Sequence, residues 1–194
     1  MPDGKATPGL PVSEPLNGID LEALQGVVQA IANDPGKAKV AFRIRSAWQG
    51  QTRSRAEVTS YTIGGERVAR RFSIDVDEPF ELLGENTAPN PQEMLMAALN
   101  ACVMVGYVVG AAVRGIRLAS LEIECQGELD LRGFLSLDGG ARPGYDKLRY
   151  TVRIKGDGTP AQFREIHDNV VRTSPNYLNL AEPVPIEARL ELGD

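Results

Sequence analysis

The chain has 194 residues, of which 42% are hydrophobic and 24% charged, the composition of an ordinary globular protein. Its net charge of -5 argues against a dedicated nucleic-acid-binding protein, because such proteins usually present a basic face. Two cysteines are too few for a disulfide framework, so the sequence does not require an oxidising compartment.

The N-terminal segment has three prolines between positions 8 and 15 and no apolar core or cleavage-site pattern. It therefore argues against a secretory signal, predicts a mobile arm and favours a cytoplasmic location. An amphipathic helix is predicted over residues 19–32, because one apolar stripe repeats there at helical spacing. The residues of that stripe are Leu21, Leu24, Val28 and Ile31.

Three strands are predicted next. Apolar and basic residues alternate over residues 40–45, which is typical of a half-buried strand. A turn at Gly64-Gly65 separates the second strand from a third, over residues 67–76. Trp48, between the first two strands, is predicted to lie in the core.

A long helix is predicted from Pro91, with Asn90 as its N-cap, Glu93 completing a capping box and Gly115 ending it. Residues 94–113 carry no charge, and that length would cross a bilayer, but five alanines and two glycines make the segment weakly hydrophobic. We therefore interpret it as a buried central helix and not as a membrane span. Since one domain of this size cannot bury every face of such a helix, the sequence predicts a homodimer.

The remaining elements are predicted to be two strands, a helix and a last strand. Alternating patterns mark strands within residues 118–131 and 148–155, with a glycine-rich long turn over residues 133–144 between them. A helix begins at Thr159-Pro160, and the last strand covers Val184 to Leu190. Strands that follow one another through hairpin turns predict an antiparallel α+β layer fold.

Cys102, near the middle of the uncharged helix, is the strongest candidate for chemistry. A cysteine in such a place packs as a small inert hydrophobe unless a positive charge stabilises its thiolate. It lies twelve residues beyond the helix cap, where the helix dipole contributes little, so an arginine from elsewhere would be needed. Arg67, Arg70 and Arg71 form a small local cluster of that kind.

The other reactive residue types have simpler interpretations. Cys125 falls on the inward face of its strand and is predicted to be core packing. His167, the single histidine, is predicted to lie at the surface or its boundary. One histidine and two separated cysteines do not make a zinc site, and no phosphate-binding or dinucleotide motif is present, so no metal or cofactor is predicted.

Residues 90–102, NPQEMLMAALNAC, resemble the signature of the OsmC/Ohr family, in which an Asn-Pro-x-Glu start leads through an alanine-rich helix to a cysteine. The loop DEPFELLGENTAPNPQEML and the C-terminal TSPNYLNLAEPVPIEARL also resemble the OsmC-like branch. The likeness covers about residues 38–192. Residues 1–37 are accordingly predicted to be a mobile arm with an added helix, and residues 38–194 an OsmC-like domain.

The resemblance implies an intertwined α+β homodimer, with antiparallel sheets packed around long central helices. It also implies thiol chemistry, in which the helix cysteine attacks a peroxide to give a sulfenic acid and a second cysteine then forms a disulfide with it. Cys102 matches the attacking position. Arg71 is the nearest match to the arginine that assists it, and Arg67 or Arg70 are the alternatives.

Two positions depart from the family's pattern. Ser174 stands where the family has its second cysteine, and Gln92 stands where the well-studied peroxidases have a glutamate, although Glu93 matches the glutamate of the wider family. Because serine cannot form a disulfide, an oxidised Cys102 would be resolved by an external thiol, or by Cys125 after a rearrangement.

The sequence thus predicts a cytoplasmic OsmC-like homodimer that reduces organic hydroperoxides with a single reactive cysteine. Cys102 is the predicted nucleophile and Arg71 the residue that stabilises its thiolate. The predicted partners are a peroxide and an external thiol reductant, with no nucleic acid, membrane or cofactor. The alternative is a non-catalytic dimer that keeps the fold and acts as a binding or structural protein.

Overall fold

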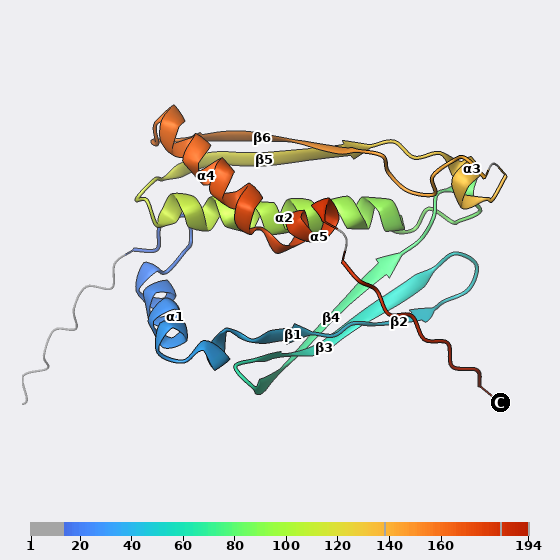
Figure 1. Ribbon diagram of the computed structural model, residues 1–194, viewed down its shortest axis with the longest axis horizontal. Helices are drawn as coiled ribbons and strands as arrows, with labels where there is room; N and C mark the ends of the chain where they lie inside the picture. Colours follow the sequence, from blue (N-terminus) through green and yellow to red (C-terminus); the bar gives the residue numbers. More distant parts are fainter. Residues whose placement is uncertain (1–13, 138, 183, 194) are drawn as a thin grey trace, which may run out of the picture.

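The computed structural model describes residues 14–137, 139–182 and 184–193, so most of the predicted N-terminal arm lies outside the described residues. The described chain contains helices and two antiparallel sheets, which confirms the predicted α+β fold (Figure 1). Its elements are α1 (Leu21–Asn33), the 3-10 helix η1 (Pro35–Ala38), β1 (Val40–Phe42), β2 (Arg45–Trp48), β3 (Ser54–Ile63), β4 (Glu66–Val76), the 3-10 helix η2 (Phe80–Leu82), α2 (Pro91–Ala112), β5 (Leu118–Gly127), α3 (Leu131–Phe134), β6 (Leu148–Gly156), α4 (Pro160–Thr173) and α5 (Pro175–Ala181).

The elements are arranged around the long helix α2. The hairpin of β5 and β6 lies along one side of α2, and α4 and α5 pack against the same helix (Figure 1). The sheet of β1 to β4 lies on the opposite side of α2, and its strands contact mainly one another. The C-terminal segment leaves α5 and runs past that sheet.

Local capping defines where α2 begins. Asn90 accepts a hydrogen bond from the Glu93 backbone N–H at 2.9 Å, and the Glu93 carboxylate accepts one from the Asn90 N–H at 2.8 Å. Pro91 occupies the first helical position, where its missing N–H costs nothing. The predicted capping box is therefore confirmed, and it explains Glu93 without a chemical role.

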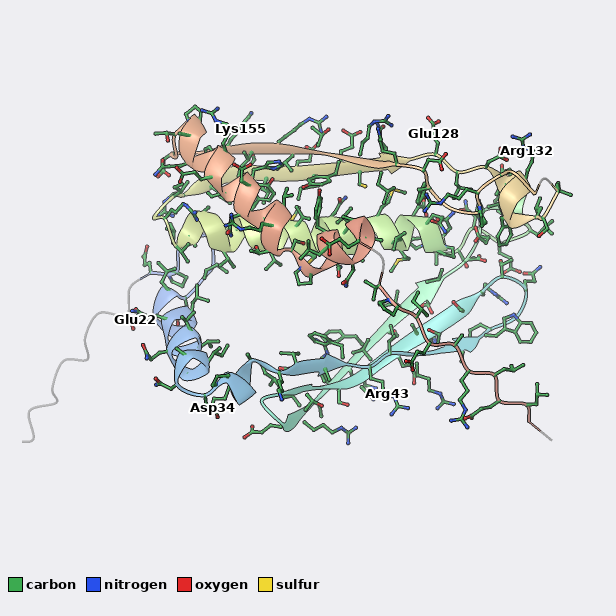
Figure 2. The ribbon with its side chains drawn as sticks, in the orientation of Figure 1. Glu22, Asp34, Arg43, Glu128, Arg132 and Lys155 are labelled. Carbon is green, nitrogen blue, oxygen red and sulfur yellow. The ribbon has the colours of Figure 1, made fainter. Side chains whose placement is uncertain are left out.

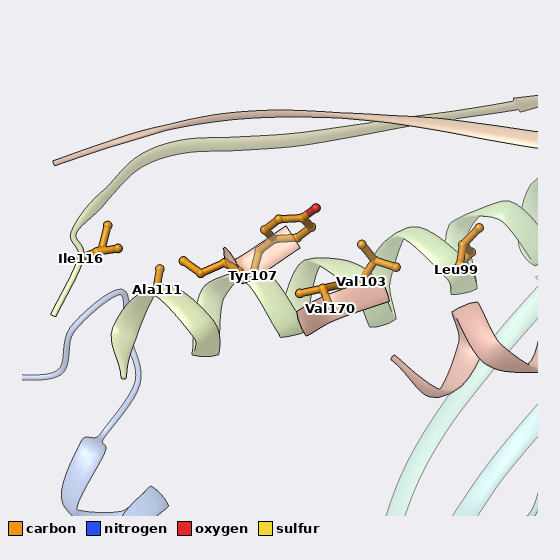
Figure 3. Close-up of a cluster of buried hydrophobic side chains, with 7 residues drawn as sticks. Leu99, Val103, Tyr107, Ala111, Ile116 and Val170 are labelled. Atoms are coloured by element: carbon orange, nitrogen blue, oxygen red, sulfur yellow. The ribbon is translucent and has the colours of Figure 1, made fainter. Parts of the chain in front are cut away.

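The buried core is a single cluster on one face of α2. Leu99, Val103 and Tyr107 of α2 pack against Ile166 and Val170 of α4, and the cluster continues along the helix (Figure 3). Gly106 permits this close approach, because a Cβ atom there would lie 2.9 Å from Val170 Cγ2. Helix α2 has the length and apolar composition of a membrane span, and one of its faces forms the core of this fold. The predicted burial on every side is not seen in the single chain, where 22% of the apolar window is buried and Val105 is 63% exposed.

The β1–β4 sheet is built on β3, and its strand ladders are interrupted at one point. The predicted first strand is split at residues 43–44, so β1 pairs with residues 61–63 of β3 and β2 with residues 54–57. On the other side, the register between β3 and β4 shifts between Val58 and Ser60. Thr59 is consequently the one residue of β3 without a register partner in either ladder.

Both faces of this sheet are largely exposed in the single chain. Ala56 is its only buried residue, whereas Trp48 is 76% exposed and Phe42 and Phe72 are also open to solvent. The prediction that Trp48 lies in the core is therefore wrong for one chain on its own, because the described residues do not cover its side chain.

Two further predictions about local structure are corrected. The predicted last strand, Val184 to Leu190, is not a strand in the described chain, and Ile186 is 89% exposed. Its alternation fits a strand, but it pairs with no strand in the part of the chain that the structure describes. The glycine-rich segment that was predicted to be one long turn contains the short helix α3 at its start.

The chain before α1 is attached to the turn after α2. The Asn17 side-chain amide donates to the Ile116 carbonyl and its carbonyl accepts from the Leu118 N–H, both at 2.9 Å. Asn17 has a positive φ of 55°, a conformation that asparagine tolerates better than most residues. These two hydrogen bonds, the Asn17 clasp, join the predicted N-terminal addition to the start of β5.

Candidate functional site

Cys102 lies on α2 next to the buried hydroxyl of Ser174. Ser174 Oγ is 3.3 Å from Cys102 Sγ, in a geometry in which the hydroxyl donates to the sulfur. Ser174 is only 5% exposed, and the Cys102 residue is half-buried. The structure therefore brings together two residues that are 72 positions apart in the sequence, the candidate nucleophile and the residue at the expected second-cysteine position.

The junction of α4 and α5 fixes the Ser174 side chain in place. Ser174 ends α4 and caps α5, where its oxygen accepts the Tyr177 N–H at 3.4 Å. With that acceptor role taken, the hydroxyl proton is free to point at sulfur. The Asn176 side chain donates to the Ala98 carbonyl of α2 at 2.8 Å, which anchors α5 against the same helix.

The contact has a defined chemical consequence. A hydroxyl that donates to sulfur stabilises the charged thiolate more than the neutral thiol, and hydrogen bonds to charged groups are stronger than neutral ones. A serine at this position provides that hydrogen bond but cannot close a disulfide. The pair therefore cannot resolve an oxidised Cys102 through a disulfide between these two residues.

Cys125 is in a different environment. It lies on β5, packs against the α2 core and is aligned with Tyr150 of β6. Burial raises the pKa of the Cys125 thiol, and a hydrogen bond from the Gln126 backbone only partly opposes this. The neutral thiol is a poor nucleophile. Both cysteines are free, and Cys125 behaves as the packing residue that the sequence predicts.

The three candidate arginines lie on β4, in the sheet on the far side of α2. Arg67 donates to Ser60 Oγ at 3.1 Å, and the Arg70 guanidinium lies over the rings of Tyr61 and Phe72. Arg71 is exposed and makes no such contact among the described residues. Nor does any arginine of the described chain hydrogen-bond Cys102, so the predicted pairing of Cys102 with Arg71 stays a prediction.

His167 is exposed on α4, where the sequence predicts it, but it has a buried partner. The Tyr107 hydroxyl and His167 Nδ1 are 2.5 Å apart. Tyr107 is almost completely buried, and burial raises the pKa of its hydroxyl, so it stays protonated. His167 therefore satisfies a buried hydroxyl in the core and is not directed at Cys102.

The buried carboxylate of Asp77 is a feature that sequence reasoning missed. Asp77 is 1% exposed and accepts hydrogen bonds from the Thr52 and Thr87 hydroxyls and from three backbone N–H groups of the loop that precedes α2. Arg53, in the turn between β2 and β3, joins that turn to the same loop through an ion pair of 2.8 Å with Glu85. The loop that carries the chain into α2 is thus fixed to the β2–β3 hairpin.

We expect Asp77→Asn to lower the melting temperature by about 5 °C or more at neutral pH, because an amide group cannot accept all of these hydrogen bonds. Burial alone would raise the pKa of Asp77, but the hydrogen bonds from Thr87, Thr52 and Glu78 outweigh it and hold that pKa well below its usual range.

The depressed pKa also sets a pH dependence. Stabilisation by Asp77 is present above its unfolded pKa of about 4 and is lost as the pH falls towards the lower folded pKa. Thermal melts from about pH 6 to 3 should therefore show the difference between wild type and Asp77→Asn shrinking as the pH falls. A difference that stayed constant or grew with acidification would contradict this role.

No cluster of histidine, cysteine, aspartate and glutamate that could hold a metal ion occurs in the described ranges.

Comparisons with known proteins agree with this architecture. Residues 84–189, more than half of the chain, match the family described as OsmC-like protein. The solved OsmC-like protein of Mycoplasma pneumoniae superimposes with a TM-score of 0.58 at 15% identity, covering 73% of this chain and 88% of that one. A Psychrobacter arcticus 273-4 structure, named for osmotic stress induction and detoxification response, gives 0.53 at 15% identity, covering 69% and 84%. No curated protein matches the sequence.

Proposed function

Because the chain belongs to the OsmC-like family, we propose that it is a thiol-dependent reductase of organic hydroperoxides in which Cys102 is the single reacting cysteine. The observation that supports this most directly is the hydrogen bond from Ser174 to the Cys102 sulfur. It gives the thiolate a donor at the position where a second cysteine would otherwise stand.

The proposed reaction has two half-cycles. The Cys102 thiolate attacks the peroxide, so that an S–O bond forms as the O–O bond breaks, and the leaving alkoxide takes up a proton to become an alcohol. An external thiol then attacks the sulfenic sulfur, releasing water and forming a mixed disulfide. A second external thiol breaks that disulfide and returns Cys102 to the thiolate.

We further propose that the working form is a homodimer in the cytoplasm. The aromatic side chains of β1, β2 and β4, and the apolar residues of the C-terminal segment, are left exposed by the described residues of a single chain. Uncovered apolar surface of this extent is typical of an interface. A second copy would also supply the positive charge that a Cys102 thiolate needs. Of the three arginines of β4, Arg71 is the one without a side-chain contact among the described residues.

The homodimer is expected to show in the fluorescence of Trp48, the only tryptophan. At micromolar concentration the protein should have twice the mass of one chain by light scattering, and Trp48 should emit as a buried indole. Dilution that dissociates the dimer should shift the emission to longer wavelength. A monomeric protein with solvent-exposed Trp48 emission at all concentrations would contradict the dimer.

The proposed activity is tested by the consumption of cumene hydroperoxide, with dithiothreitol, glutathione or dihydrolipoamide supplied in turn. Wild-type protein and Cys102→Ser are compared, and dimedone labelling followed by mass spectrometry locates any sulfenic acid. If no reductant supports consumption that depends on Cys102, the reductase proposal fails and the non-catalytic binding dimer is the remaining interpretation.

A further inference from the structure

The start of α5 is bonded at two points to the part of α2 that carries Cys102. Ser174, the N-cap of α5, donates to Cys102 Sγ at 3.3 Å. Asn176, in the first turn of α5, donates to the Ala98 carbonyl at 2.8 Å. In an α-helix each N–H donates to the carbonyl four residues earlier, so the Ala98 carbonyl is also the acceptor of the Cys102 N–H. Asn176 therefore bonds to the backbone group that holds Cys102 in its helix.

Helix α5 depends on contacts with the rest of the chain. It has seven residues, none of which is buried, and isolated helices shorter than about 12 residues are marginal in water. The ring of Tyr177 lies edge-on to Tyr150 of β6, with the two centroids 6.2 Å apart. Asn176 adds a direct hydrogen bond to α2 in the first turn, next to the Ser174 cap.

The direction of the Ser174 hydroxyl depends in turn on α5. Its oxygen accepts the Tyr177 N–H at 3.4 Å, which is a contact that requires the first turn of the helix to be formed. A hydroxyl has one proton, and an oxygen that already serves as the cap acceptor keeps this proton available for the Cys102 sulfur. If the first turn of α5 frayed, the hydroxyl would be free to rotate towards another acceptor.

The position of this hydroxyl matters because the sulfur has little other support. Within the described ranges, Ser174 is the one side chain that hydrogen-bonds Cys102 Sγ. The charged residues labelled in Figure 2 lie at the ends and outer edges of the molecule, away from the junction of α4 and α5. A hydrogen bond weakens steeply as its distance and angle depart from their preferred values. A small movement of α5 would therefore be enough to weaken the contact with sulfur.

We propose that Asn176 is a positioning residue for Cys102. By fixing α5 on α2, it keeps the Ser174 hydroxyl directed at the sulfur and so raises the rate at which that sulfur reacts near neutral pH. The use of this reactivity rests on the proposed reductase function, whereas the reactivity itself can be measured by alkylation, without peroxide or reductant.

Alkylation of the native full-length protein by iodoacetamide, followed on the Cys102 peptide by mass spectrometry, tests the proposal. The rate at pH 7 is divided by the plateau rate at alkaline pH, because a change in accessibility alters both rates and a change in thiolate content alters only the first. Asn176→Ala should lower this ratio by about threefold or more, and Ser174→Ala by about tenfold, since hydrogen bonds to charged groups are strong. The double variant should match Ser174→Ala, because Asn176 acts through that hydroxyl.

Asn179→Ala is the matched control, because Asn179 is exposed on the same helix and its side chain makes no hydrogen bond among the described residues. Its ratio should stay within about 1.5-fold of wild type. Asn176→Ser, whose side chain is too short for the Ala98 carbonyl, replaces Asn176→Ala if circular dichroism shows that the alanine variant is unfolded.

An unchanged ratio in Asn176→Ala, an equal fall in Asn179→Ala, or additive losses in the double variant would overturn the proposal. If the expected alkylation pattern were found in a protein that consumed no peroxide, the reductase function would be refuted and the role of Asn176 supported.

Discussion

Replacing Cys102 with serine is expected to lower the consumption of organic hydroperoxide by at least about a hundredfold. The reaction requires a sulfur that is ionised near neutral pH, and a serine hydroxyl is not ionised there. The fold should survive, because serine has almost the same volume and the position is only half-buried. Initial rates of cumene hydroperoxide loss with dithiothreitol provide the measurement, and the melting temperature confirms folding.

Cys125→Ser is the matched control for that experiment. It makes the same chemical change at the other half-buried cysteine, whose pKa is raised by burial. Its rate should stay within about threefold of wild type, since Cys125 has no proposed part in the reaction. Loss of activity in Cys125→Ser with full activity in Cys102→Ser would transfer the nucleophile to β5 and refute the proposed site.

Replacing Ser174 with cysteine is expected to convert the site into one that forms an internal disulfide. Ser174 Oγ already lies 3.3 Å from Cys102 Sγ, and an S–S bond of about 2.05 Å needs only a small closer approach. After one equivalent of peroxide, Ser174→Cys should lose two hydrogens in mass spectrometry and bind no dimedone. The neighbouring thiol has a high effective concentration, so capture of the sulfenic acid should be more than about a hundredfold faster than capture by millimolar glutathione.

Thr173→Cys tests whether proximity or an extra thiol causes the effect. Thr173 is the adjacent residue, but it is exposed and its hydroxyl is bonded to the Asn169 carbonyl, on α4 itself. This variant should stay unable to form a disulfide with Cys102 and should keep the wild-type dependence on external thiol. If Ser174→Cys also kept free thiols after peroxide treatment, the Ser174–Cys102 contact would have no bearing on the reaction.

The elements that the sequence predicts well are those fixed by neighbouring residues. Helices α2 and α4 begin where Asn90 and Thr159 predict, because both starts are capping boxes that need only residues three positions apart. The β5–β6 hairpin is confirmed because alternation of inward and outward side chains is a local pattern.

The failures share the opposite cause. Trp48 and the segment from Val184 have the apolar pattern of buried residues, but burial depends on what lies against them, and the described residues of one chain leave both exposed. The split of the first strand at residues 43–44 likewise depends on the register of β3. A pattern of apolar residues predicts that one face of an element is buried, but it does not identify the element or the second chain that packs against that face.

The candidate site was only partly predictable for the same reason. A motif within one helix identifies Cys102, and the resemblance to the family places Ser174 at the position of the second cysteine. That the two side chains touch depends on the packing of α4 on α2 through Gly106. The hydrogen bonds of Asp77 join the β2–β3 hairpin to the loop before α2, and no short sequence motif predicts contacts between segments that far apart.

The clasp made by Asn17 limits where the polypeptide can be shortened. A fragment cut to the region that matches the family would leave the Ile116 carbonyl and the Leu118 N–H without the side chain that serves both. Those groups sit at the entrance to β5, so the cut would loosen the strand that lies against the core helix. Expression vectors for crystallisation or labelling should therefore begin upstream of residue 17.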